Sequence, residues 1–458
     1  MTKMILPLII LLTASIAYSQ LPNTLSGAEK VYGLARIWQE VNYNFVYLEK
    51  INRKQWDSTF KDMITEVQST ENDYQYYRDL QRFCAILHDG HTNVSFPWRL
   101  DLVILNSMFG KYRLSLANIE HKAVVVSTNL SAKDQIPIGS EVVNVNGLTT
   151  REYIARNVAP YISSSTGYVL EDLCVARLLQ GPKGDHFDIT LRTPEGTMKE
   201  LALVHDWTDE QEVYPIPEAQ ELLIFKWCDN HIAYVALNSF MDPRIDTLFE
   251  KRLPELHNAK AVIIDLRKNE GGRSDIGENI LQYLTYDTLL YGSKSVSRMH
   301  IPTYKAWGVW VKPGSAIKEE LAEKSLLYFH DKAYYEFEYA PDTIRPAARR
   351  VVVPTVLLIG HSTGSAAEDF LILADKQKHM IKIGENSSGS TGQPYIFDLP
   401  GGGTARVCTK KDTYPDGREF VGYGVTPDIE VRPTLRDFIA RKDAALEKAI
   451  EYLSLHIK

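Results

Sequence analysis

The chain carries the sequence PTVLLIGHSTGSAAE at residues 354–368. Residues 354–360 form an apolar run, which is typical of a strand buried on both faces of a sheet. Small residues follow, and the pattern from about Ala366 to Lys376 indicates a helix. The stretch therefore predicts a strand, a tight loop and a helix that begins at Ser365.

The same order recurs upstream. Residues 261–266 form another continuous apolar run, and the segment DLRKNEGG ends at Gly272. Ile276, Ile280 and Leu284 then recur at the spacing of a helix, and residues 232–237 read as one more strand. This alternation of strands and helices after Trp207 predicts an α/β core.

Two different patterns precede this core. From about Ala28 to Leu87 apolar residues recur three and four positions apart, which predicts a small helical domain. From about Leu100 to Trp207 short apolar runs alternate with turns such as Asn146-Gly147, which predicts a β module. Its strand before Asn146-Gly147 looks like that of a PDZ-type peptide-binding module, although a generic small β domain fits as well.

The N-terminus has the pattern of a signal peptide. Lys3 precedes an apolar stretch, and Ala17-Tyr18-Ser19 places small residues where a signal peptidase cleaves, before Gln20. The stretch is short for a membrane span, and a buried first helix or an uncleaved anchor is the alternative. We therefore expect an exported protein, periplasmic or extracellular.

Composition excludes some classes of function. The formal net charge is −7 and no long basic run occurs, so a nucleic acid is not an expected partner. The cysteines lie far apart without a C-x-x-C pair, so no zinc or redox motif is visible; they are Cys84, Cys174, Cys228 and Cys408. Export permits disulfides, and the sequence does not decide whether any form.

Ser365 is the strongest candidate for chemistry. A serine between a buried strand and a helix exposes its hydroxyl at the carboxyl edge of the sheet, where open α/β proteins bind ligands. The first amides of the helix also favour a developing negative charge there. Many serines at this position only cap the helix, and that alternative stays open.

Two further sites complete the candidate set. Gly271 and Gly272 follow a buried strand, and amides there could supply half of an oxyanion hole, with Ala366 supplying the other half, unless the glycines only form a turn. His91 follows Gly90 in a sharp turn, and neutral His is the usual base for a Ser nucleophile. His88 and His91 as metal ligands are the alternative, but no third ligand is paired with them by spacing.

Ordered motifs then make the resemblance specific. The DGHT turn ends at Thr92, the DLRKNEGG segment at Gly272, and the GSAAE segment starts at Gly364. A glycine-rich LPGGG segment and the closing motif GYGVTPDIEV, residues 422–431, follow in order. These motifs resemble the C-terminal processing and tricorn-core family of serine peptidases, also called tail-specific proteases.

The resemblance implies an α/β, mixed multi-domain fold whose protease core is crotonase-like, with ββα units. Together with the patterns above, the expected domains are a signal peptide at residues 1–19, a helical domain at 20–99, a PDZ-like domain at 100–207 and a catalytic domain at 208–458. The resemblance implies Ser365 as nucleophile, His91 as general base, and Ala366 with Gly271 or Gly272 as oxyanion donors. Protein or peptide substrates are expected, and no cofactor or metal.

The chain departs from the family pattern at the base and at the acid. In the processing-peptidase branch a Lys is the base, and the matching position here is Ser390, so the tricorn-like, His-based branch fits better. The acid of that branch aligns with Val421, but Glu419 would share a strand face with it and is our candidate orienting acid. Because Ser390 has no role in this scheme, the sequence predicts that Ser390→Ala is mild.

The expected function is an exported serine endopeptidase that cleaves unstructured or C-terminal protein segments through a Ser365 acyl-enzyme. A catalytically inactive peptide-binding protein of the same fold is the alternative, and an esterase is a third reading. The aromatic stretch from Tyr304 to Tyr339 fits either a lid or a packed insertion. The sequence does not determine the oligomeric state.

Overall fold

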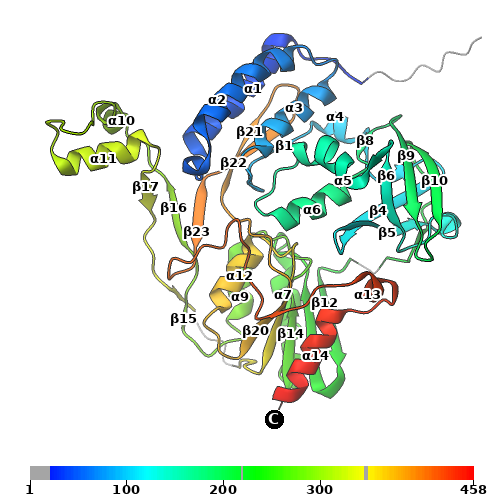
Figure 1. Cartoon of the computed structure of the whole chain (residues 1–458). Helices are drawn as coiled ribbons and strands as arrows, with labels where there is room; N and C mark the ends of the chain where they lie inside the picture. The colour runs from blue at the N-terminus through cyan, green and yellow to red at the C-terminus, as the bar shows by residue number, and fades with distance from the viewer. Residues whose placement is uncertain (1–20, 218–219, 345–348, 458) are drawn as a thin grey trace, which may run out of the picture.

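The computed structural model describes residues 21–457, apart from residues 218–219 and 345–348. The predicted signal peptide, residues 1–19, lies outside the described residues. Figure 1 shows a helical region, a β module beside it, an α/β core beneath both, and a helical hairpin that projects from the body. None of the described helices combines the length and the apolar character that a bilayer crossing requires.

The predicted N-terminal helices are present. They are α1 (Gly27–Asn44), α2 (Arg53–Gln68) and α3 (Asp73–Ala85). Buried apolar residues face inward at helical spacing, and the ring of Trp56 stacks on that of Phe83 with centroids 4.0 Å apart. The turn after α3 carries His91.

A late hairpin completes the helical region. The strand β1 (Asn93–Ser95) pairs with β22 (Thr404–Cys408), which pairs with β21 (Pro394–Asp398). The buried Tyr77 hydroxyl donates to Pro400 O at 2.6 Å and accepts from Gly403 N at 2.9 Å. Segments more than three hundred residues apart therefore form one unit, and this unit fixes the turn that bears His91.

The β module is a mostly antiparallel sheet in the order β10-β9-β6-β5-β4-β3. Its strands are β3 (Met108–Phe109), β4 (Tyr112–Ile119), β5 (Lys122–Asn129), β6 (Glu141–Val145), β9 (His186–Arg192) and β10 (Met198–Val204). Asn146 and Gly147 turn with positive φ between β6 and β7 (Leu148–Thr149), as the sequence predicts. The helices α5 (Thr150–Tyr153) and α6 (Gly167–Ala176) cover the sheet, and the module has its own apolar core.

One edge of this sheet is largely open. Strand β4 pairs with β5 along its length, whereas on its other side it pairs with β3 only at Tyr112 and Arg113. Helix α6 packs beside β4. Within the described residues, the outer edge of β4 from Leu114 onward therefore has no partner strand, and such an edge can accept an extended peptide.

The α/β core is a six-stranded sheet in the order β12-β13-β14-β19-β20-β24. The strands are β12 (Leu223–Cys228), β13 (Ile232–Leu237), β14 (Ala261–Asp265), β19 (Thr355–Ile359), β20 (Met380–Gly384) and β24 (Ile429–Glu430). All neighbours are parallel except β12 and β13. The mixed α/β fold class predicted from the sequence is confirmed.

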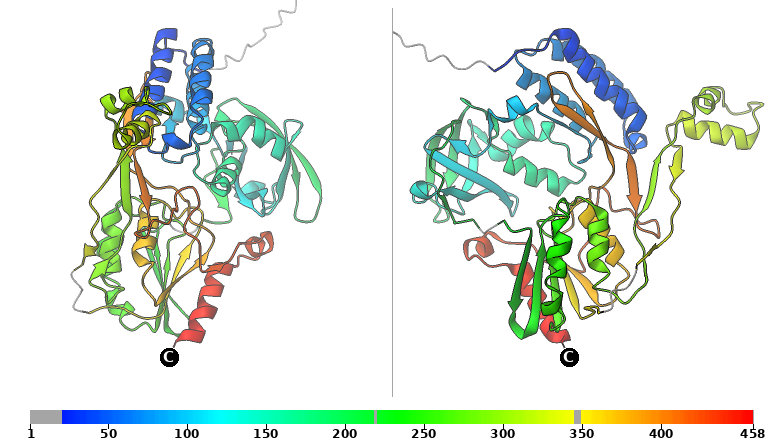
Figure 2. Two further views of the ribbon diagram at one scale, coloured as in Figure 1. Left: turned by 60° about the vertical axis from the view of Figure 1, so that its left-hand side comes forward. Right: turned by 180° about the vertical axis from the view of Figure 1, so that it is seen from behind.

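Helices cover both faces of this sheet (Figures 1 and 2). Alternate strand residues pack under α7 (Arg244–Glu250), α9 (Ser274–Leu281) and α12 (Ala366–Ala374), and the others pack under α14 (Ala444–His456). Because each strand is covered twice, its sequence is a continuous apolar run. The loops after β14, β19 and β20 leave the same edge of the sheet, and they build the site described below.

The aromatic stretch from Tyr304 to Tyr339 lies mostly in a helical hairpin. The helices α10 (Pro302–Gly308) and α11 (Glu319–Phe329) are carried by β16 (Lys294–Arg298) and β17 (Tyr334–Glu336), and β16 pairs with β23 (Lys410–Thr413). Figure 2 shows this hairpin projecting from the body. It is therefore carried by a separate three-stranded sheet, β17-β16-β23, rather than packed flat on the core.

Candidate active site

Ser365 lies where the sequence places it, between β19 and α12. Its backbone has φ 51° and ψ −122°, a region that residues with a Cβ rarely adopt. Such strain costs about 1–3 kcal/mol and persists only where the surroundings impose it, often at a nucleophile on a sharp strand-to-helix turn. Ser365 is the N-cap of α12 in a capping box with Glu368, and its strained backbone goes beyond what an ordinary cap requires.

The carboxylate of Glu368 holds this turn in place. One oxygen accepts from Ser387 Oγ at 2.5 Å and Gly389 N at 2.7 Å, and the other accepts from Ser390 N at 3.1 Å and Ser365 N at 3.3 Å. Burial raises the pKa of Glu368 to about 8, while the bonds from Ser387, Gly389 and Ser390 act in the opposite direction. The side chain joins the loop after β19 to the loop after β20.

The glycine pair packs directly against the nucleophile. A Cβ added to Gly271 would lie 2.7 Å from Ser365 Cβ and 2.8 Å from Ala366 N, and one added to Gly272 would lie 2.3 Å from Phe240 C. Both glycines have positive φ, 101° and 138°. Both positions therefore require glycine, for space and for backbone conformation.

The amides near Ser365 divide into two kinds. Gly271 N donates to the side chain of the buried Asn269 at 2.9 Å, so it is already engaged. Among the hydrogen bonds between described residues, the amides of Gly272 and Ala366 donate none. The predicted set of Gly271, Gly272 and Ala366 lies together, and Gly272 with Ala366 are the better pair of oxyanion donors.

His91 reaches the same place from the helical region. Its Nδ1 lies 2.7 Å from Ser390 Oγ, and Ser390 O accepts from Ser365 N at 3.0 Å. The structure, over its described residues, has no hydrogen bond from the Ser365 hydroxyl to His91; catalytic bonds are often loose without substrate. Burial, Arg406 and Lys410 lower the pKa of His91 to about 4, so the ring is neutral at pH 7.

The turn that bears His91 is tied down by its neighbours. The Thr92 hydroxyl donates to the buried Asp89 carboxylate at 2.6 Å and accepts from Cys408 N at 3.0 Å. Arg406 donates to Gly90 O at 3.1 Å. The imidazole is thus fixed to the β1–β22 unit.

Glu419 does not reach His91. Its carboxylate pairs with Lys411 Nζ at 2.6 Å, and this contact, first among the causes, lowers the pKa of Glu419. Val421, at the position aligned with the family acid, is buried. The structure thus brings together all the predicted site residues except Glu419, and the role of Glu419 stays a prediction that no contact supports.

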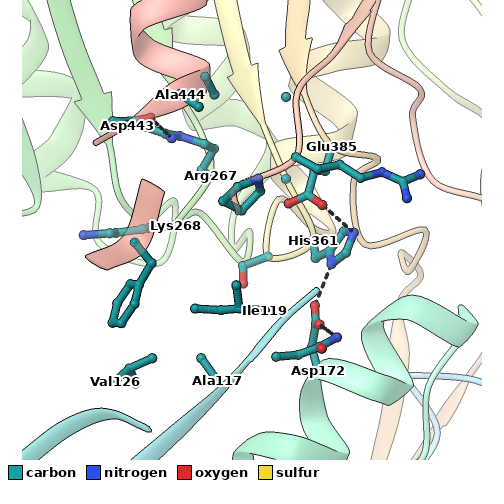
Figure 3. A pocket seen from close by; sticks show the side chains of 18 of the residues that line it. Ala117, Ile119, Val126, Asp172, Arg267, Lys268, His361, Glu385, Asp443 and Ala444 are labelled. Atoms are coloured by element: carbon teal, nitrogen blue, oxygen red, sulfur yellow. Dashed lines mark hydrogen bonds and ion pairs between the residues drawn. The ribbon is translucent and has the colours of Figure 1, made fainter. Parts of the chain in front are cut away.

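A wide groove separates the β module from the core (Figure 3). It is lined by β4 and α6 on one side and by the loops after β14, β19 and β20 on the other. His361 bridges it, with Nδ1 2.6 Å from Asp172 on α6 and Nε2 3.9 Å from Glu385. Ser365 and His91 do not line this groove, so it approaches the site without containing it.

Over the described residues, no group of three or more His, Cys, Asp and Glu side chains is arranged to hold a metal ion.

Some residues around Ser365 and His91 were not predicted from the sequence. Glu368 belongs to the motif at residues 354–368, and an acid on the buried face of the predicted helix could have indicated its role. Asp89 and Ser390 lie in segments that the sequence analysis quotes, but nothing in the sequence indicates that Ser165 joins them, since the three side chains meet only in three dimensions.

Residues 231–431 match the model of Peptidase family S41. The chain carries a peptidase family S41 domain. The resemblance stated from the motifs is thereby confirmed, and the domain is of the serine peptidase type. No curated protein gave a significant match.

Solved structures extend the likeness to the rest of the fold. Mature CPAF complexed with lactacystin is 15% identical, with a TM-score of 0.62 over 93% of this chain and 97% of that one. A putative peptidase from Parabacteroides merdae is 16% identical, with a TM-score of 0.50 over 94% and 97%. The photosystem II D1 C-terminal processing protease is 17% identical, with a TM-score of 0.45 over 91% and 98%. At these identities the first two show a shared fold.

Glu368→Gln should disturb the S41 site while keeping side-chain volume. A neutral amide turns one acceptor into a donor, which then faces the amides of Ser365 and Ser390. We expect a loss of about 1–3 kcal/mol in the free energy of unfolding, as for a buried unsatisfied polar group, and a slower reaction of Ser365 with a fluorophosphonate probe. Urea unfolding and probe labelling measure both.

Asp369→Asn is the matched control, since the Asp369 carboxylate accepts from Ser274 and Ser293 and not from the Ser365 loop. Labelling of Glu368→Gln at the wild-type rate would show that this carboxylate does not hold the nucleophile.

Proposed function

We propose that the protein is an exported serine endopeptidase with Ser365 as nucleophile and His91 as general base. The carrying observation is the convergence of three features at one point. They are the strained turn of Ser365, the unengaged amides of Gly272 and Ala366, and the neutral imidazole of His91, held through Ser390. The S41 domain supports the reaction class.

The proposed reaction follows from these groups. Ser365 Oγ attacks a peptide carbonyl while His91 Nε2 takes the hydroxyl proton, and the amides of Gly272 and Ala366 donate to the oxyanion. His91 returns the proton to the leaving amine, which leaves an acyl-enzyme. Water activated by His91 then releases the acid product and restores Ser365.

The proposed substrates are unstructured or C-terminal segments of proteins. The open edge of β4 beside α6 supports a PDZ-like role for the module, because an extended peptide can add there as a strand. The groove next to it continues toward the loops that carry Ser365. The proposal of export is based on the N-terminal signal-peptide pattern. N-terminal sequencing of the secreted protein tests it, and the mature chain should begin at Gln20.

A peptide-binding protein without turnover is the second candidate. The absence of a bond between His91 and the Ser365 hydroxyl among the described contacts favours it, as does the pairing of Glu419 with Lys411. Such a protein would bind peptides through the β module and resist serine-reactive probes.

Ser365→Ala should abolish cleavage of a flexible protein such as casein and labelling by a fluorophosphonate probe. Loss of a triad nucleophile lowers kcat by a factor of order 10⁶. Ser362→Ala, an exposed serine in the same loop, is the control and should retain both activities. Cleavage that persists in Ser365→Ala would identify another nucleophile, and a wild type that neither cleaves nor labels would favour the second candidate.

The β module should bind an apolar-ended peptide through its C-terminal carboxylate. We expect amidation of that terminus to weaken binding to the full-length Ser365→Ala variant, as measured by calorimetry, because strand addition alone does not read a free carboxylate. Equal affinity of the two peptides would remove the carboxylate from the recognition.

The pH profile should report a buried His. Because the pKa of His91 is lowered to about 4, the ring stays neutral and able to accept a proton well below the ordinary range of His. Activity should therefore be lost only as pH falls below about 5, rather than between about 6 and 7 as an unperturbed His predicts. The acidic limb of kcat/KM measures this, and a limb several units higher would indicate a Lys base.

A further inference from the structure

The Ser390 hydroxyl occupies a position that the reaction scheme does not explain. It lies 2.7 Å from His91 Nδ1 and 3.3 Å from the hydroxyl of Ser165. Ser165 Oγ lies in turn 3.4 Å from Asp89 Oδ1. Three side chains thus continue from the far side of the imidazole to a buried carboxylate.

We propose that Ser390, Ser165 and Asp89 form a hydrogen-bonded chain that positions His91 and sets which ring nitrogen carries its proton. This inference rests on the proposed role of His91 as base. Ser390, in direct contact with the ring, is the main positioning residue, and Ser165 and Asp89 act through it.

The donors along the chain can run in one direction. For His91 Nε2 to accept the Ser365 proton, Nδ1 must carry its own hydrogen, and the nearest acceptor is Ser390 Oγ. Ser390 then has its proton free for Ser165, and Ser165 has its proton free for Asp89. Every proton stays on its own atom, so the chain orients the base and stabilises the imidazolium.

Gly90 makes the space for this arrangement. A Cβ at residue 90 would lie 2.7 Å from Ser390 Oγ, so any larger residue would push the hydroxyl away from His91. Gly90 N donates to Ser165 Oγ at 2.9 Å, which fixes the middle of the chain. The other oxygen of Asp89 is occupied by Thr92, so the carboxylate cannot rotate freely.

Ser165 comes from the β module, and its neighbours dock that module on the loop that carries Ser390. The Thr166 hydroxyl donates to Ser388 O at 3.2 Å, and the Tyr168 hydroxyl donates to Ser387 O at 2.7 Å. The chain is therefore assembled from the turn after α3, the β module and the core.

The charges around His91 explain why such support is needed. Arg406 on β22 and Lys410 on β23 lower the pKa of the ring, although Lys410 is partly neutralised by Asp412 at 3.1 Å. Asp89 lies in the same turn as His91, and burial raises the pKa of Asp89 to about 6. A chain that ends on Asp89 therefore favours the imidazolium against two cations.

The test compares full-length Ser390→Ala, Ser390→Thr and Ser165→Ala with the control Ser163→Ala, for which no hydrogen bond is seen among the described residues. We expect Ser390→Ala to lower kcat between about 10-fold and about 100-fold, as for a lost hydrogen bond to a charged group, with KM changed by less than about 2-fold. Ser390→Thr, which keeps the hydroxyl, should recover most of the loss. Ser165→Ala should have a smaller effect of the same kind.

The pH profile separates positioning from mere packing. Without the Ser390 hydroxyl, Nδ1–H of His91 loses its hydrogen-bond acceptor and the imidazolium is less favoured, so the acidic limb of kcat/KM in Ser390→Ala should move to lower pH. Gly90→Ala, which displaces the hydroxyl sterically, should show the same shift. An unchanged limb in both variants, or a Ser390→Ala variant with wild-type kcat, would overturn the chain.

The controls keep the two proposals distinct. If wild type is labelled at Ser365 while the Ser390 and Gly90 variants behave as wild type, only the chain fails. If wild type is not labelled at Ser365 at all, the proposed function fails first and the chain with it.

Discussion

The buried carboxylate of Glu368 is the contact on which the rest of the site depends. It is the first acid of α12, so the helix that presents Ser365 also supplies the group that binds the neighbouring loop. Its hydrogen bonds reach the amides of Ser365, Gly389 and Ser390. The carboxylate binds the loop after β19 and the loop after β20 at once. The conformation of each loop therefore depends on that of the other.

The sequence was sufficient for the strands of the α/β core and for the turns that follow them. The runs at residues 261–266 and 354–360 are buried on both faces, and so they read as strands without any knowledge of their partners. Ser365 and the glycine pair follow such runs directly. Their meeting at one sheet edge follows from parallel pairing of β14 with β19, which the alternation of strands and helices implies.

Residues that act across modules escaped the same reasoning. Ser165 lies in a short run of hydroxyl residues without periodicity, and only the docking of the β module brings it to Gly90. Glu419 shows the opposite failure: residues 418–421 do not form the expected strand, Glu419 is exposed while Val421 is buried, and Lys411 on the adjacent strand lies within reach of the Glu419 carboxylate. A nearby cation competes for an acid more strongly than a neutral imidazole does.

The position matching the family Lys illustrates how a base can be exchanged. A Lys base must lose several pKa units to be neutral near pH 7, and burial among cations achieves this at a cost in stability. With Ser390 there, the base in the proposed mechanism is His91, whose pKa burial and two cations lower to about 4. A base so far lowered is always neutral but accepts a proton weakly. In the proposed chain, the neutral hydroxyl of Ser390 links the ring to Asp89. This link stabilises the protonated form of His91 and so makes the ring a stronger base.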